Sequence, residues 1–165
     1  DLLARHYQTG ESLPQDLFDK MLAARHFHAG LFLVRQLEFA LFDFRVHLDY
    51  TPETGARVLE RLAEVRKQVA VIEPPSWHRF PNTFTHIFSG GYAAGYYSYL
   101  WAEVLSADAF AAFEECGLFD AATGQRFRDE ILAVGGSRPA LESFVAFRGR
   151  EPEAEALLRS YGLAA

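Results

Sequence analysis

The tyrosines in the segment Ser89–Val104, SGGYAAGYYSYLWAEV, have the spacing of a hydrogen-bonding surface. If a helix begins near Tyr92, then Tyr92, Tyr96 and Tyr99 lie at positions i, i+4 and i+7 and share one face. Each phenol hydroxyl can donate a hydrogen bond. His86 lies just upstream as a further donor. The residues alone therefore indicate a row of donors on one side of a helix.

Three glycines, Gly90, Gly91 and Gly95, accompany these tyrosines. Because glycine has no side chain, a ligand backbone could approach closely here. Each glycine also weakens a helix by about 1 kcal/mol, which would leave this end mobile. Two interpretations stay open: a buried aromatic stripe, in which every phenol needs a partner, or a wall that faces a ligand. The chain uses Phe freely, 15 times, where a core needs an aromatic ring.

The elements that must position these residues are predicted to be helices throughout, in an irregular all-α architecture. The apolar segment 17–47 predicts one long helix or two helices broken near residues 28–30, buried in a larger body. Two further helices are expected over 93–115 and from Asp120 to 135–136. The remaining predicted elements are a helix end at 1–8, a helix start at Pro14, a helix from Thr51 to Pro74, a helical turn at 84–88, and short helices beginning near Pro139 and Pro152.

Composition excludes several classes of function. With 165 residues the chain can form one domain with a core. A net charge of −6 argues against nucleic acid as a partner, and no apolar run is long enough to span a membrane. A single cysteine, Cys116, fits a reducing, cytoplasmic location and is expected to be a packed thiol. His26 and His28, two residues apart on a helix, face different sides and are not expected to bind a metal.

Three longer stretches carry a family resemblance. They are FPNTFTHIFSGGYAAGYYSYLWAEVLSADAF (Phe80–Phe110), VRQLEFALFDFRVH (Val34–His47) and GGSRPALESFVAFRGREPEAEALLRSYGL (Gly135–Leu163). Together they resemble the C-terminal part of the oligopeptidase A and thimet oligopeptidase family of zinc metallopeptidases. The bacterial oligopeptidase A and dipeptidyl carboxypeptidase branch fits best. The resemblance covers essentially the whole chain and implies that residues 1–165 are a C-terminal fragment of a helical peptidase domain.

The resemblance also implies roles for individual residues. Tyr99 resembles the tyrosine that donates a hydrogen bond to the oxyanion of the tetrahedral intermediate, and His86 resembles a histidine that assists substrate or transition-state binding. Tyr92 and Tyr96 resemble tyrosines of a glycine-rich substrate loop, to which Gly90–Gly91 would give flexibility. In this family zinc is held by an H-E-x-x-H helix and a later Glu. Those ligands would lie upstream of Asp1, so no metal ligands are expected in this chain.

Two hypotheses follow for the function. In the first, the chain supplies the substrate-binding loop and the oxyanion-stabilising tyrosine of a zinc-dependent oligopeptidase that hydrolyses short peptides, and is inactive alone. In the second, it is a non-catalytic helical module that binds peptides or acts as a scaffold. The expected partners are short peptides and the remainder of the parent chain. The apolar helix also suggests self-association of the fragment.

Overall fold

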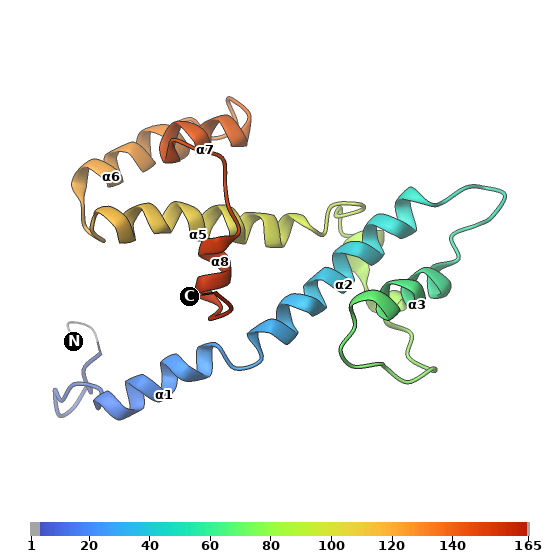
Figure 1. Cartoon of the computed structure of the whole chain (residues 1–165), viewed down its shortest axis with the longest axis horizontal. Helices are drawn as coiled ribbons and strands as arrows, with labels where there is room; N and C mark the ends of the chain where they lie inside the picture. The colour runs from blue at the N-terminus through green and yellow to red at the C-terminus, as the bar shows by residue number, and fades with distance from the viewer. Residues whose placement is uncertain (1–3, 165) are drawn as a thin grey trace.

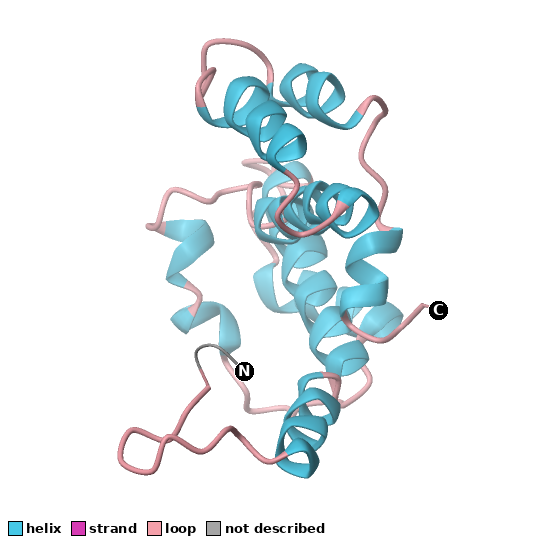
Figure 2. Ribbon diagram, turned by 90° about the vertical axis from the view of Figure 1, so that its left-hand side faces the viewer, coloured by secondary structure: helices cyan, strands magenta, loops and turns pink. Residues whose placement is uncertain are grey.

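The computed structural model describes residues 4–164, which form helices joined by turns and loops (Figure 2). In chain order they are α1 (Gln15–Arg25), α2 (Ala29–Leu48), α3 (Val58–Val69), η1 (Phe80–Thr83), α4 (Thr85–Phe88), α5 (Ser98–Cys116), α6 (Ala121–Phe127), η2 (Arg128–Leu132), α7 (Ala140–Arg148) and α8 (Glu155–Ser160). η1 is a 3-10 helix and η2 is a π-helical turn. Bridges between extended residues within 4–164 are isolated pairs and form no sheet. The predicted all-α fold is confirmed.

The apolar segment 17–47 is divided between two helices, which is one of the two predicted arrangements. α1 ends at Arg25 and α2 begins at Ala29. The break falls at His28, whose φ of 58° is left-handed and cannot continue a right-handed helix. Figure 1 shows α1 at the lower left and α2 following it, after a change of direction, along a diagonal that rises to the right.

The helix end predicted at 1–8 is wrong for its described part. Arg5 and Ser12 form an isolated antiparallel bridge, so the chain turns back on itself before α1. Residues 1–3 of that prediction lie outside the described residues. Turn residues cluster between Tyr7 and Gly10, and Gly10 has a φ of 71° that favours glycine.

A first core forms where α3 lies antiparallel against the C-terminal half of α2 (Figure 1). η1 and α4 close the same core from the next segment of the chain. Its buried residues are Phe42 and Val46 of α2, Leu62 and Val65 of α3, Phe84 between η1 and α4, and Ile87 of α4. The segment that precedes the tyrosines is held to this core because Phe80 of η1 stacks on Phe39 of α2 with ring centroids 4.8 Å apart.

The helix predicted from Thr51 to Pro74 is shorter at both ends in the structure, where it is α3, Val58–Val69. The start predicted at Thr51 is wrong, because Thr51 and Gly55 close a turn and α3 begins only at Val58. The same helix ends at Val69, five residues before Pro74, where Ala70 turns to an extended conformation. The helical turn predicted at 84–88 is confirmed as α4.

A second core forms around the C-terminal half of α5, covered by α6, η2 and α7, while α8 packs on another side (Figure 1). Its buried side chains are Ala109, Ala112, Phe144 and Phe147. The predicted cap at Asp120 is confirmed, since its Oδ2 accepts a hydrogen bond of 2.7 Å from the Thr123 N–H. The predicted stop at Gly117 is also confirmed by its φ of 116°.

A buried ion cluster fixes the end of this second core. Asp108 is 0% exposed and accepts hydrogen bonds from Arg148, Arg150 and the Glu153 N–H. Burial acts to raise the pKa of Asp108, but the hydrogen bonds outweigh it and hold this pKa below its ordinary value. The cluster therefore ties the segment between α7 and α8 to α5.

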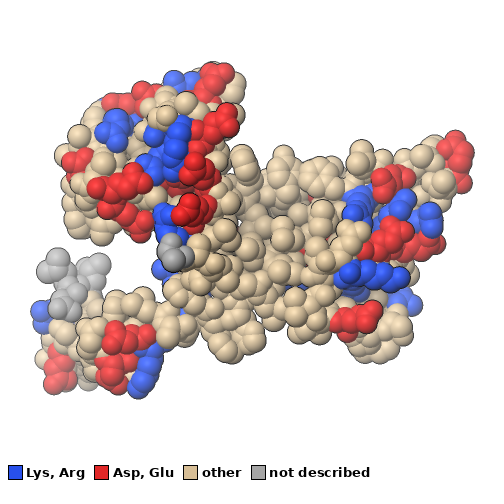
Figure 3. Space-filling model, viewed as in Figure 1, with Lys and Arg blue, Asp and Glu red and all other residues tan. Residues whose placement is uncertain are grey.

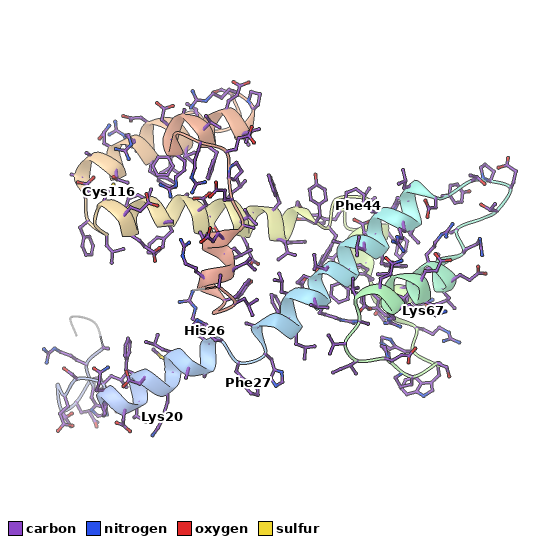
Figure 4. All side chains as sticks on the ribbon, viewed as in Figure 1. Lys20, His26, Phe27, Phe44, Lys67 and Cys116 are labelled. Carbon is purple, nitrogen blue, oxygen red and sulfur yellow. The ribbon has the colours of Figure 1, made fainter. Side chains whose placement is uncertain are left out.

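The surface is divided by charge. Figure 3 shows charged side chains over α3 at one end of the molecule and over α6 and α7 at the other, with a largely uncharged surface between them. Many apolar residues are exposed along α1 and α2, among them Met21 and Phe32. Phe27, in the link between the two helices, is also exposed (Figure 4). Cys116, predicted to be packed, is exposed at the end of α5. Within residues 4–164, no helix is long and apolar enough to cross a membrane.

Candidate functional site

The tyrosines lie on a turn and on the helix that follows it, rather than on one helix. α5 begins at Ser98, five residues after the predicted start, so Tyr92 and Tyr96 belong to the loop between α4 and α5. The argument from positions i, i+4 and i+7 is therefore wrong for this segment. The chain nevertheless brings the predicted rings together by turning, with hydrogen bonds from Gly95 N–H to Tyr92 O and from Ser98 N–H to Gly95 O.

The four predicted aromatic site residues form one cluster. Tyr92 stacks on Tyr99 with ring centroids 5.1 Å apart and an interplanar angle of 27°. Tyr96 lies 5.2 Å from Tyr99 on another side. The imidazole of His86 lies 5.9 Å from the Tyr96 ring and 6.3 Å from each of the other two. Residues separated by up to 13 positions are thus gathered around the Tyr99 ring.

A pocket of about 290 Å³ opens beside this cluster. Its lining is aromatic and polar and comes from α2, α4, α5 and the loop between α4 and α5, residues 89–97, which we call the tyrosine loop. The lining residues are Phe32, Gln36, His86, Tyr96, Tyr99, Leu100 and Glu103. Glu103 accepts a hydrogen bond from the Tyr161 hydroxyl, so α8 supports the far side of the pocket. The pocket offers imidazole, phenol, amide and carboxylate groups to the same small volume.

The neighbouring tyrosine, Tyr97, does not belong to this pocket. Its ring stacks on Phe44 with centroids 5.3 Å apart and an angle of 28°. Phe44 is labelled in Figure 4, where it projects from the C-terminal half of α2. Tyr97 therefore packs the loop against α2, while Tyr96 and Tyr99 line the pocket and Tyr92 stacks on Tyr99.

The phenol groups of the cluster differ in what they can donate. The Tyr96 hydroxyl donates a hydrogen bond of 2.9 Å to Gln36 Oε1, so its proton is already engaged. Burial raises the pKa of Tyr96. The hydrogen bond with Tyr92, followed by burial, raises the pKa of Tyr99. The Tyr99 hydroxyl is therefore protonated at neutral pH, and an acceptor in the pocket would receive its hydrogen bond in place of Tyr92.

Gly90 and Gly91 are required by the backbone conformation of this segment, independently of any ligand. A Cβ at Gly90 would lie 2.9 Å from the Cα of His86 and 3.0 Å from its carbonyl oxygen. Gly91 has a φ of 81°, a conformation that favours glycine, and a Cβ there would meet open space. These two glycines end α4 and let the backbone fold back over His86, where the Tyr92 N–H donates to the His86 oxygen.

Sequence reasoning missed the residue that holds this loop. Asp43 of α2 is fully buried, and its carboxylate accepts hydrogen bonds from the Ala94 N–H at 2.8 Å and the Tyr96 N–H at 2.9 Å. The available signal was an acidic residue inside an otherwise apolar stretch of α2. A buried carboxylate needs partners, and here they are backbone N–H groups of a distant loop.

The described residues do not provide a metal centre. Within 4–164, no group of three or more His, Cys, Asp or Glu side chains is arranged to hold a metal ion. The pocket beside Tyr99 contains a single imidazole and a single carboxylate, those of His86 and Glu103. A tetrahedral zinc site with three or four protein ligands does not fit this donor set.

Comparisons with known proteins match nearly the entire chain. The model of peptidase family M3 matches residues 1–163. The chain is 59% identical to oligopeptidase A of Escherichia coli over 161 residues, and 53% identical to oligopeptidase A of Haemophilus influenzae over 161 residues. It is 38% identical to a dipeptidyl carboxypeptidase of Salmonella typhimurium over 162 residues.

These matches cover the chain and the relatives very differently. They include 97–98% of this chain but 24% of each of these three relatives. The chain thus spans about a quarter of the length of the curated relatives that it matches. The resemblance seen in the sequence motifs is confirmed, and the identity to these two oligopeptidases A exceeds that to the dipeptidyl carboxypeptidase. The chain belongs to peptidase family M3.

Proposed function

We propose that this chain is a C-terminal fragment, residues 1–165, of a zinc-dependent oligopeptidase, and that it forms the substrate-facing wall and the oxyanion donor of the active site. The substrates would be short peptides. Membership of family M3 supports the peptidase assignment. The single observation that carries the assignment of the site is the cluster of His86, Tyr92 and Tyr96 around Tyr99, next to a pocket of about 290 Å³.

In this proposal Tyr99 is the catalytic donor. Peptide hydrolysis passes through a tetrahedral intermediate, whose carbonyl oxygen gains negative charge. A fixed neutral phenol can donate a hydrogen bond to that oxygen without reorganising. Stacking on Tyr92 and contact with Tyr96 fix the Tyr99 ring. Removal of one such donor typically costs roughly 2.7–4 kcal/mol in the barrier.

The other residues of the cluster bind and orient the peptide. His86 lines the pocket and offers a ring nitrogen to a backbone oxygen of the substrate. The Tyr96 hydroxyl donates its hydrogen bond to Gln36, so toward a substrate it offers an acceptor oxygen and a ring face. Tyr92 supports Tyr99 and contributes the outer edge of the wall, with Gly90–Gly91 allowing the loop to settle over peptides of different sequence.

The metal would come from another part of the parent protein. The donor set of residues 4–164 does not fit a zinc site, and the relatives are about four times longer than this chain. The remainder of the parent chain is therefore the partner that this proposal requires. The chemistry assigned to residues 1–165 is restricted to binding the peptide and stabilising charge.

A conservative substitution in the full-length parent tests the role of Tyr99. Tyr99→Phe keeps the ring and removes the hydroxyl. We expect kcat to fall by about 10²- to 10³-fold with little change in KM. Tyr97→Phe is the matched control, because Tyr97 stacks on Phe44 outside the pocket, and should leave both constants near those of the unaltered enzyme.

Three outcomes would contradict the proposal. A Tyr99→Phe enzyme with unchanged kcat would remove the oxyanion role from Tyr99. If the unaltered parent bound peptides but did not hydrolyse them, the alternative would be favoured, a non-catalytic helical module that binds peptides or acts as a scaffold. The isolated 165-residue chain, given zinc and a fluorogenic peptide, should show no turnover, and clear zinc-dependent cleavage would also contradict this assignment.

A further inference from the structure

A buried carboxylate of α2 is hydrogen-bonded to the backbone of the tyrosine loop. Asp43 is 0% exposed, and both of its oxygens are occupied. Oδ1 accepts from the Ala94 N–H at 2.8 Å, and Oδ2 accepts from the Tyr96 N–H at 2.9 Å. These bonds join residues 51 and 53 positions apart in sequence. Ala94 and Tyr96 lie in the loop between α4 and α5, so their N–H groups have no helical partner and donate to this carboxylate instead.

The loop needs such a restraint because its backbone is strained. Ala94 has a φ of 52°, which is left-handed and unfavourable for a residue with a side chain. Strained residues persist only where their surroundings over-determine the conformation. Asp43 accepts one hydrogen bond from the N–H of the strained residue Ala94 and a second from the N–H of Tyr96, two residues later. Hydrogen bonds to a carboxylate are among the stronger ones in proteins.

The carboxylate is itself fixed within α2. His47 lies one turn later, and its Nδ1 is 2.9 Å from both the Asp43 carbonyl oxygen and Oδ1. With its proton on Nδ1, this imidazole donates to Asp43 and orients it. Asp43 therefore has a supporting contact on its own helix and two functional contacts on the loop.

The restraint leads directly to the proposed site. Tyr96, held by its N–H group, places its ring 5.2 Å from Tyr99 and 5.9 Å from His86. Its hydroxyl is held at the other end by Gln36, which is also on α2. One helix thus fixes Tyr96 at the backbone and at the tip, and Tyr96 in turn limits where Tyr99 can lie.

We propose that Asp43 is a positioning residue for the oxyanion donor: by holding the strained Ala94–Tyr96 turn, it sets the place of Tyr96 and, through it, of Tyr99. This inference rests on the proposed function in one respect, the catalytic role of Tyr99. The structural part of it concerns the loop alone. The test therefore needs one measurement on the loop and another on catalysis.

The full-length parent provides both measurements. Asp43→Asn is nearly isosteric, but its amide can accept at one position only and presents N–H groups at the other. We expect hydrogen exchange at the Ala94 and Tyr96 amides to accelerate by about tenfold or more. We expect kcat to fall by about 10- to 100-fold, as for a small misplacement of a catalytic group, with KM changed by less than about threefold and the zinc content unchanged.

Asp108→Asn is the matched control. Asp108 is also a fully buried aspartate that accepts a backbone N–H and side-chain donors, but it serves the segment between α7 and α8. Its replacement should lower overall stability without accelerating exchange at Ala94 and Tyr96 and without a selective loss of kcat. If Asp108→Asn reproduced both effects of Asp43→Asn, the effects would be general destabilisation and the proposal would be overturned.

A second variant tests the strain directly. Ala94→Gly removes the side chain that makes a positive φ unfavourable. In the Asp43→Asn background it should restore kcat several-fold, because the turn then needs less restraint. Failure of this rescue, in an enzyme that keeps its zinc, would count against the assigned link between strain and catalysis.

The outcomes separate this inference from the proposed function. Accelerated exchange at the two amides with unchanged kcat would overturn Asp43 as a positioning residue for catalysis. The role of Tyr99 itself is decided separately, by the kcat of Tyr99→Phe. If Asp43→Asn does not fold, hydrogen exchange in the unaltered parent still tests whether Asp43 restrains the loop. Its Ala94 and Tyr96 amides must be protected from exchange, and rates typical of an open loop would overturn the proposal.

Discussion

Tyr92 and Tyr99 stack on one another with ring centroids 5.1 Å apart, although Tyr92 lies in the loop before α5 and Tyr99 lies in α5 itself. In a continuous helix, residues seven apart would lie two turns from each other along the axis, about 10 Å apart. The stack is therefore a product of the loop and would be lost if the loop became helical. The position of the proposed oxyanion donor depends on the shape of this loop.

The first prediction concerns the glycine that lets the loop fold back. Gly90→Ala should lower kcat strongly, because the new Cβ would lie 2.9 Å from the Cα of His86, which is backbone and cannot rotate away. Gly95→Ala is the control, since its Cβ would meet nothing closer than 3.4 Å. Kinetics of both variants in the full-length parent check this, and equal activity of the two would contradict the tight approach at Gly90.

The second prediction concerns the hydrogen bond between Tyr96 and Gln36. Tyr96→Phe and Gln36→Leu should each lower the free energy of unfolding by about 0.5–1.5 kcal/mol. Because they remove the same bond of 2.9 Å, the double variant should lose less than the sum. Urea denaturation of the four proteins in this double-mutant cycle measures the coupling. Strict additivity would show that the two groups do not interact.

The local part of the fold could be predicted from the sequence because its signals are local. The cap at Asp120 and the stop at Gly117 depend on residues within one turn of the helix ends, and both were found. The helical turn at 84–88 follows from its neighbours in the same way. The predicted start near Thr51 failed because Thr51 and Gly55 satisfy a turn of their own before α3 begins.

The candidate site was predictable in its residue types but not in its construction. His86, Tyr96 and Tyr99 do line one pocket, yet helical spacing was the wrong reason for expecting it. The actual shape is set by Asp43, more than 50 positions away, and by a left-handed Ala94 that no propensity favours. Periodicity describes neighbours along the chain and contains no information about such distant hydrogen bonds.

The third prediction concerns the dependence of stability on alkaline pH. Burial, followed by the hydrogen bond to Glu103, raises the pKa of Tyr161 to about 12 from the ordinary value of 10.0. The contribution of this phenol to stability is complete below pH 10, where both states are protonated. It is lost as the pH rises toward 12, because the unfolded chain releases the proton first.

Urea denaturation at increasing pH checks this prediction. The difference in unfolding free energy between the unaltered protein and Tyr161→Phe should be constant below pH 10 and shrink toward pH 12. Tyr7→Phe serves as the control because Tyr7 is 87% exposed, and it should leave the profile unaltered. A Tyr161→Phe difference that stayed constant across the whole range would place Tyr161 outside the buried contact with Glu103.

The last prediction concerns the apolar face of α1. None of the residues of α1 is buried, and Leu17 and Met21, one turn apart, are 49% and 55% exposed. Burial of such side chains is worth about 1.5–3 kcal/mol each, so the isolated 165-residue chain should self-associate through this face. In the parent, we expect the additional chain to cover it. Sedimentation velocity over a range of concentrations measures the association.

A pair of charge-matched variants tests whether the apolar face itself is responsible. Leu17→Glu with Met21→Glu should weaken association by tenfold or more, since about 1.4 kcal/mol corresponds to a factor of ten. Gln15→Glu with Lys20→Gln changes the net charge of α1 by the same amount at two polar residues, of which Lys20 is labelled in Figure 4. If both pairs weakened association equally, charge would be the cause. If the unaltered chain were monomeric at every concentration, the exposed face of α1 would not be an association surface.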